Sequence, residues 1–181
     1  MLDMSTINPY STPMSDIGER QSAIQREIRQ TRPFRSLGQE GFVALLRTAD
    51  VMRRFMTRVL EPFGITTQQF NVLRILRGAG DQGVPTLTIA ERMIEEAPGI
   101  TRLIDRLEAK GLVRRQRCPG DRRQVLCFAN PAAIELLERI DGAVDSADDD
   151  ALGMLSNPEK AELIRLLDAI RAGHQKIQPG C

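Results

Sequence analysis

The side chains with the clearest chemistry in this 181-residue chain are arginines and lysines gathered in one stretch. From Ala97 to Arg123 there are eight Lys or Arg residues and three Asp or Glu residues. Guanidinium and ammonium groups bind nucleic-acid phosphates, and the planar fork of an arginine also fits the edge of a guanine. Because the net charge of the whole chain is only +1, the positive charge is concentrated here. The stretch therefore predicts a surface for duplex DNA.

A helix must present the first of these side chains. Its apolar residues recur with the 3.6-residue period of an amphipathic helix: Ile100, Leu103, Ile104 and Leu107. The spacing predicts a helix over 98–110. Three residues that could contact bases then lie on its outer face: Thr101, Arg102 and Arg106.

Arg102 is the expected base-contacting residue, with two hydrogen bonds to a guanine. The alternative is an arginine in solvent that pairs with Asp105 or Glu108 of its own helix. Pro98 and Gly99 at the start of the helix have small side chains, so their expected role is to let the backbone come close to the DNA.

A basic hairpin must present the remaining positive charges. Strands are predicted over 113–117 and 122–128, because Pro119-Gly120 between them fits the centre of a type II turn. An arginine beyond such a turn fits the narrow, electronegative minor groove. Four arginines complete the surface: Arg115 and Arg117, expected at phosphates, and Arg122 and Arg123 just past the turn.

Two helices are expected before this stretch. Thr66 precedes an apolar run that predicts a helix over 67–77, so Thr66 or Thr67 is its expected cap. A further helix is expected to begin at Thr86 or Thr88, with Thr88 and Glu91 in a capping box.

Residues 61–130 are thus predicted to be a DNA-binding domain. Residues 78–83 form a loop, and only a few residues separate the helix after it from the helix at 98–110, which is typical of a helix-turn-helix. With the hairpin added, the predicted fold is mainly α with a small β-wing: a winged helix-turn-helix flanked by N- and C-terminal dimerisation helices.

The flanks are amphipathic. Residues 37–60 carry nine apolar side chains at three-four spacing, so a dimerisation helix is expected there; the alternative is packing on this chain's other helices alone. Residues 131–176 are expected to hold C-terminal dimerisation helices. A shorter helix over 15–31, capped by Ser15 or Asp16, is expected within an added N-terminal segment. The remaining predicted segments are a flexible arm at 1–14, the added helix with its linker at 15–36, and a tail at 177–181.

Four segments resemble the MarR family of regulators: ITTQQFNVLRIL at 65–76, LTIAERM at 87–93, ITRLIDRLEAKGLVRR at 100–115 and DRRQVLCF at 121–128. The resemblance extends over roughly residues 37–171. It implies a homodimeric repressor that binds double-stranded DNA and is released by a small aromatic or phenolic acid, or by an oxidant. Two recognition helices one DNA turn apart further predict an inverted-repeat operator with half-sites about 10 bp apart.

The resemblance also implies roles for particular residues. Arg122 is expected to enter the minor groove while Arg123 pairs with Asp121 to hold the tip of the wing. One departure from the family is Glu95-Glu96, where a small polar cap is usual before the recognition helix. The effector is expected between the dimerising helices and the winged helix, although each candidate wall could instead be ordinary core: Phe42, Arg47, Met52, Phe55, Met56, Phe63 and Phe70.

The composition argues against several other classes of protein. Three cysteines without a CxxC pair and the single histidine, His174, predict neither a metal site nor a disulfide framework, and no cofactor. One histidine and a Gly-rich loop without the GK[ST] ending of a phosphate loop argue against an enzyme. No apolar run approaches the ~18 residues of a membrane span and there is no secretion signal, so a cytoplasmic protein is expected.

Two alternatives to a ligand-released repressor stay open. Cys118 lies beside Arg117 and Arg122, which favour a thiolate, so the protein could be a redox-sensing repressor. Glu95 and Glu96 could instead spoil the DNA face, which would leave a winged-helix module for protein interactions.

Overall fold

The computed structural model describes residues 21–118 and 124–175. The chain divides into two compact units, residues 1–50 and 51–181, and the boundary falls within the longest helix, α2 (Leu37–Leu60). That helix has the extent that its apolar spacing predicts. The arm and the tail expected at the two ends lie outside the described residues, as do Ser15 and Asp16.

The first unit contains a shorter helix than expected. Helix α1 covers only Ala23–Glu27, and its cap is Ser22, whose hydroxyl accepts a hydrogen bond from the backbone N–H of Gln25 at 3.3 Å. Arg29 has a φ of 54°, a left-handed conformation that a helix cannot continue through. The expected end at residue 31 is therefore wrong, because the chain leaves the helical conformation before it reaches Pro33.

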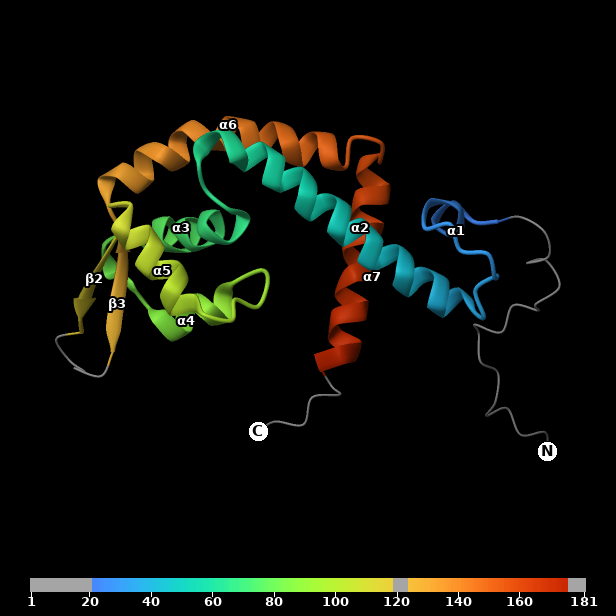
Figure 1. Cartoon of the computed structure of the whole chain (residues 1–181), viewed down its shortest axis with the longest axis horizontal. Helices are drawn as coiled ribbons and strands as arrows, with labels where there is room; N and C mark the ends of the chain where they lie inside the picture. Colours follow the sequence, from blue (N-terminus) through green and yellow to red (C-terminus); the bar gives the residue numbers. More distant parts are fainter. Residues whose placement is uncertain (1–20, 119–123, 176–181) are drawn as a thin grey trace. The chain divides into compact units, whose positions relative to one another are not determined.

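The second unit holds the winged helix-turn-helix, and Figure 1 shows α3, α4 and α5 gathered beside the sheet. Helix α3 packs against α5, α6 and the strand β3, so its apolar residues form the centre of the core. Thr66 and Gln69 cap α3 with reciprocal hydrogen bonds of 3.2 and 3.1 Å. The helices of this unit are α3 (Thr67–Ala79), α4 (Thr86–Arg92), α5 (Ile100–Ala109), α6 (Pro131–Ala151) and α7 (Asn157–Gln175).

The start of α4 differs from the prediction. The helix begins at Thr86 with Pro85 as its cap and has no side-chain cap hydrogen bond. Thr88 therefore lies inside the first turn, where it cannot form the expected capping box with Glu91. A 3-10 turn over Gly80–Gln82 occupies part of the loop predicted at 78–83.

The sheet has three antiparallel strands instead of the two predicted. They are β1 (Val84–Pro85), β2 (Val113–Arg117) and β3 (Val125–Ala129), in the order β1-β3-β2. Cys127 is central, because it lies opposite Val84 on one side and Arg115 on the other. Strand β1 escapes prediction because two residues, one of them a proline, are too short to show an alternating pattern. The expected start of the last strand at residue 122 falls outside the described residues.

The last helix, α7, has an apolar side that is not fully buried in the described chain. None of its residues with a described side chain is buried. Leu163, Leu166, Leu167 and Ile170 recur at the helical period, and the exposed fractions of Leu166 and Ile170 are 46% and 45%.

Among the described residues, no helix is long and apolar enough to cross a membrane.

Candidate nucleic-acid interface

Helix α5 separates its apolar and polar sides as its sequence predicts. Leu103, Ile104 and Leu107 are buried, and Ile100 packs against the core at its edge. The opposite side is exposed and carries Thr101, Arg102 and Arg106. The helix is thus held through one side, which leaves the other side available to a partner.

The start of α5 is open. Pro98 and Gly99 are exposed, and Gly99 caps the helix with a φ of 90°. No side chain caps the first turn, and it contains no acidic residue. The first N–H groups of α5 therefore have no side-chain acceptor, which suits close approach of an anion.

Arg102 and Arg106 form no ion pair with any residue in 21–118 or 124–175. The alternative for Arg102, a pair with Asp105 or Glu108 of its own helix, is not what the structure contains. Both carboxylates bind Arg115 of β2 instead. The positive charges of Arg102 and Arg106 are consequently left without a neutralising partner on this surface.

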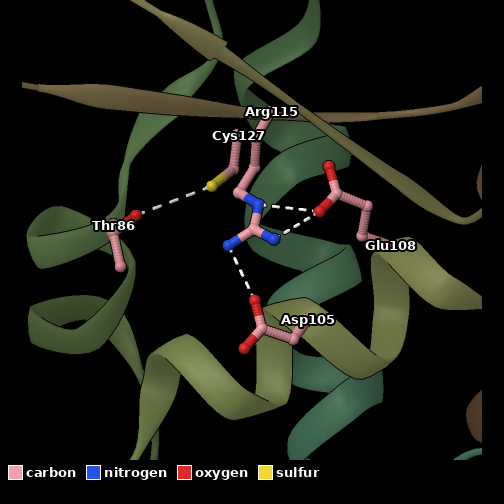
Figure 2. Close-up of polar contacts among 5 residues, drawn as sticks. All are labelled: Thr86, Asp105, Glu108, Arg115 and Cys127. Atoms are coloured by element: carbon pink, nitrogen blue, oxygen red, sulfur yellow. Dashed lines mark hydrogen bonds and ion pairs between the residues drawn. The ribbon is translucent and has the colours of Figure 1, made fainter.

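Arg115 lies between the two carboxylates, as Figure 2 shows. Its Nη1 is 2.7 Å from an Asp105 oxygen, its Nε donates to Glu108 at 2.8 Å, and its Nη2 also donates to Glu108. These bonds raise the pKa of Arg115, and the Arg115 guanidinium lowers the pKa of Glu108. We call Asp105, Glu108 and Arg115 the Arg115 cluster; it joins the recognition helix to the first strand of the hairpin.

Cys127 lies next to this cluster, on the facing strand. Its side chain is fully buried, and its Sγ is 3.7 Å from the hydroxyl oxygen of Thr86. Burial raises the pKa of the Cys127 thiol, so this residue is a small packing residue of the strand. Cys118 is half-buried, and its N–H donates to the carbonyl of Gln124 at 3.0 Å.

The structure describes two further arginines of the hairpin, which have different surroundings. Arg114 lies 4.0 Å from the centre of the Phe128 ring, in a cation–π contact. Arg117, at the end of β2, is exposed and pairs with none of the described residues. Asp121, Arg122 and Arg123, expected at the tip of the wing, lie outside the described residues.

The turn between α4 and α5 is bound by one residue of α3 and one residue of α2. The side-chain oxygen of Asn71 on α3 accepts a hydrogen bond from the N–H of Ile94 at 2.9 Å. Arg53 of α2 donates to Glu95 at 2.7 Å. Glu95, a departure from the family pattern, therefore has a basic partner. The unusual position of Glu95 was the only sequence feature that pointed to this contact. Its partner could not be identified from the sequence, because Arg53 is 42 residues away.

The candidate effector residues have different surroundings in the two units. In the first unit, Phe42 is 61% exposed, and Arg47 binds Glu27 at 2.7 Å. In the second unit, Phe70 is buried, while the other four are half-buried. Met56 and Phe63 pack on the hydrophobic core. Three of the four belong to α2: Met52, Phe55 and Met56. His174, near the end of α7, is exposed.

Comparison with known proteins places the same stretch in one family. Residues 65–125 match the model of the MarR family. The chain is 29% identical over 130 residues to a protein of Thauera aromatica named as a transcriptional regulatory protein for the hcr operon, covering 72% of this chain and 77% of that one.

Solved structures have the same fold. A MarR transcription factor from Planctomyces limnophilus is 41% identical, with a TM-score of 0.59, over 76% of this chain and 99% of that one. S. aureus MepR in a complex with DNA is 25% identical, with a TM-score of 0.65, over 72% of this chain and 96% of that one. The winged helix-turn-helix expected from the sequence is confirmed.

Proposed function

The chain belongs to the MarR family of DNA-binding transcriptional regulators, and on that premise we propose that it is a homodimeric repressor. It binds an inverted-repeat operator in duplex DNA and leaves it when a small aromatic or phenolic acid binds.

The observation that carries this proposal is the charge of the exposed side of α5. Arg102 and Arg106 have no ion-pair partner among the described residues, whereas the carboxylates of the same helix bind Arg115. An ordinary solvated helix would be free to pair its own charges at three- and four-residue spacing. Here the acids are drawn to the hairpin, and the helix presents arginine to the solvent.

Each residue of this surface has a proposed role. Arg102 and Arg106 contact base edges and Thr101 contacts a base or a phosphate, since an arginine in the major groove binds guanine with two hydrogen bonds. Pro98 and Gly99 allow the backbone to come close. Arg117 binds a phosphate. Asp121, Arg122 and Arg123 form the wing tip, with one arginine in the minor groove.

Two unpartnered apolar surfaces support the proposed dimer. The apolar side of α7 is exposed in the single chain, and on α2 the exposed fractions of Phe42 and Leu46 are 61% and 55%. A second copy would cover such surfaces, as in obligate dimers whose interfaces resemble a divided core. A two-fold dimer then contacts two half-sites about 10 bp apart.

Fluorescence anisotropy tests the DNA-binding part, with the full chain and duplexes from the region upstream of its own gene. We expect saturable binding whose affinity falls with salt by about 0.9 in log K per log salt for each phosphate contact. DNase I footprinting should then show two protected half-sites in inverted orientation. Absence of binding at low salt would instead favour a protein-interaction module.

A thermal-shift screen tests the release. Benzoate, salicylate and related phenolic acids are added to the protein with and without its operator. We expect one class to raise the melting temperature of the free protein and to lower the anisotropy of the complex. Hydrogen peroxide is the parallel treatment: release by peroxide that is lost in Cys118→Ser would identify the redox alternative.

A further inference from the structure

We propose that Arg115 is a positioning residue, which fixes the hairpin to the recognition helix so that both approach DNA as one rigid body. This inference rests on the proposed function, because it concerns how the same surface binds DNA. It assigns Arg115 a role different from the phosphate contact expected of an arginine on this strand.

The geometry of the guanidinium supports this role. Arg115 uses Nη1 for Asp105 and both Nε and Nη2 for Glu108, so three of its nitrogens point at α5. Asp105 and Glu108 are three residues apart, which places them on adjacent turns of one side of the helix. A guanidinium fixed by two carboxylates in this fork-like manner is strongly oriented, and its donors are directed at α5.

The position of Arg115 in the sheet makes the link effective. Arg115 lies opposite Cys127, the central residue of the three strands, and Cys127 is fully buried. A side chain that is anchored at the middle of β2 and bound to α5 at its far end adds a polar link between two elements that lie against each other. Rotation of the hairpin about α5 would break these bonds.

Arg117 supplies the contrast on the same strand. It lies two residues beyond Arg115, on the same side of β2, and it has no ion-pair partner among the described residues. If both arginines bound phosphates, replacing either one should change the salt dependence of DNA binding to the same extent. If Arg115 is a positioning residue, only the replacement of Arg117 should change that salt dependence by the amount of one phosphate contact.

The first experiment compares Arg115→Met with Arg117→Met in operator binding over a range of salt concentrations. Methionine keeps much of the length of the side chain without its charge. We expect Arg117→Met to reduce the slope of log K against log salt by about 0.9, the value for one phosphate contact. Arg115→Met should weaken binding by roughly tenfold at every salt concentration while its slope changes by less than half of that value. If Arg115→Met also reduced the slope of log K against log salt by about 0.9, the proposal would be overturned.

A charge exchange gives the second readout and guards against simple misfolding. Arg115→Glu alone should weaken binding strongly. Combined with Glu108→Arg, it restores the pair with reversed polarity, and the new guanidinium also lies three residues from Asp105. We expect the double variant to recover most of the operator affinity. A phosphate contact cannot be recovered in this way, since a carboxylate would face the DNA, so failure of a folded double variant to recover would contradict the positioning role.

A third readout needs no DNA. In a Cys118→Ser, Cys181→Ser background, the rate at which Ellman's reagent labels Cys127 reports how often the hairpin separates from α5. We expect Arg115→Met to raise this rate by about threefold or more, and Arg117→Met to leave it unchanged. Failure of the wild-type chain to bind any duplex would overturn the proposed function, whereas equal labelling of Cys127 in wild type and Arg115→Met would overturn the Arg115 cluster as a link.

Discussion

At the scale of single residues, the partners of the two acids on α5 determine the charge that DNA would meet. Asp105 and Glu108 share a helix with Arg102 and Arg106, but both acids bind Arg115 within about 3 Å, and its positive charge offsets one of their two negative charges. The three arginines and two acids sum to +1, and the acids are drawn toward Arg115, so Arg102 and Arg106 give the outer face of α5 a positive field. The local arrangement of five charged residues thus produces a basic surface on a chain whose net charge is only +1.

The first prediction concerns Arg102. We expect Arg102→Ala to weaken binding to the operator by about 1–3 kcal/mol, because it removes a two-bond contact to a base. Binding to a scrambled duplex of equal length should change much less. Competition anisotropy with both duplexes measures the difference. Arg139→Ala, at an exposed position of α6, is the matched control and should change neither affinity. An equal loss on both duplexes would mean that Arg102 contacts a phosphate instead of a base.

The second prediction concerns Gly83, which precedes β1. Its φ is +66°, and a Cβ built there would lie 2.5 Å from the ring of Phe128. Gly83→Ala should therefore lower the free energy of unfolding by about 2 kcal/mol, from the left-handed backbone and the steric clash together.

Gly78→Ala is the control for this substitution. Gly78 lies within α3, and an added Cβ would meet nothing within 4 Å. Alanine at such a helical position should stabilise the protein by about 0.5–1 kcal/mol. Urea unfolding followed by circular dichroism compares the two variants. A Gly83→Ala variant as stable as wild type would show that Phe128 can move away from this contact.

At the scale of elements, a few polar links fix how helices and strands lie against one another. The Arg115 cluster joins α5 to β2, and the pair of Arg53 and Glu95 joins the last part of α2 to the turn before α5. Arg77 of α3 binds both carboxylate oxygens of Asp141 on α6, at 2.8 and 3.0 Å. Apolar packing brings these elements together, and the charged links select one orientation among those that packing allows.

The third prediction uses the link between α3 and α6. Arg77 lowers the pKa of Asp141 through two hydrogen bonds. A carboxyl whose pKa is lower in the folded state stabilises the protein above its unfolded pKa of about 3.9, and this stability is lost as the pH falls through the folded pKa.

Asp141→Asn should therefore cost about 0.5–1 kcal/mol at pH 7, because both side chains are partly exposed to solvent. The difference from wild type should shrink as the pH falls below 4 and disappear once Asp141 of the wild type is protonated. Urea unfolding at a series of pH values measures this. Asp145→Asn, on the same helix at an exposed position, is the matched control for removal of a carboxylate. A constant difference across the series would exclude the ion pair as its cause.

At the scale of the whole molecule, large apolar side chains stay exposed on two helices of the described chain. The exposed side chains are concentrated on α2 and α7 and include Phe42, Leu46, Leu166 and Ile170. Exposed apolar side chains on a helix mark an interaction site, and the proposed two-fold dimer would cover those of each helix and pair two recognition helices.

The fourth prediction tests that surface. Ile170 lies on the apolar side of α7, and Ile170→Asp should convert the dimer to a monomer, because it buries a charge in the interface. Ala172, on the opposite side of the same helix, gives the control Ala172→Asp, which should stay dimeric. Light scattering coupled to gel filtration measures both masses. A dimeric Ile170→Asp would move the proposed interface away from this side of α7.

The sequence by itself determined the elements whose signals are local. The period of Ile100, Leu103, Ile104 and Leu107 fixes the buried side of α5, and the apolar spacing over 37–60 gives the extent of α2, because a helix repeats every 3.6 residues along the chain. Short elements have too few residues for a periodic pattern to predict them or their ends. Strand β1 has two residues, and α1 ends at Glu27, where Ile28 and Arg29 leave the helical conformation.

Only the tertiary structure decided which charges neutralise one another. From the sequence, Asp105 and Glu108 are as able to pair with Arg102 of their own helix as with any other arginine, and Arg115 is one more basic residue of the hairpin. The register of β2 on β3 and the packing of α5 against β2 place Arg115 beside both acids. Coulomb energy depends on distance in space, so the allocation of charge on this surface could be known only after the chain was folded.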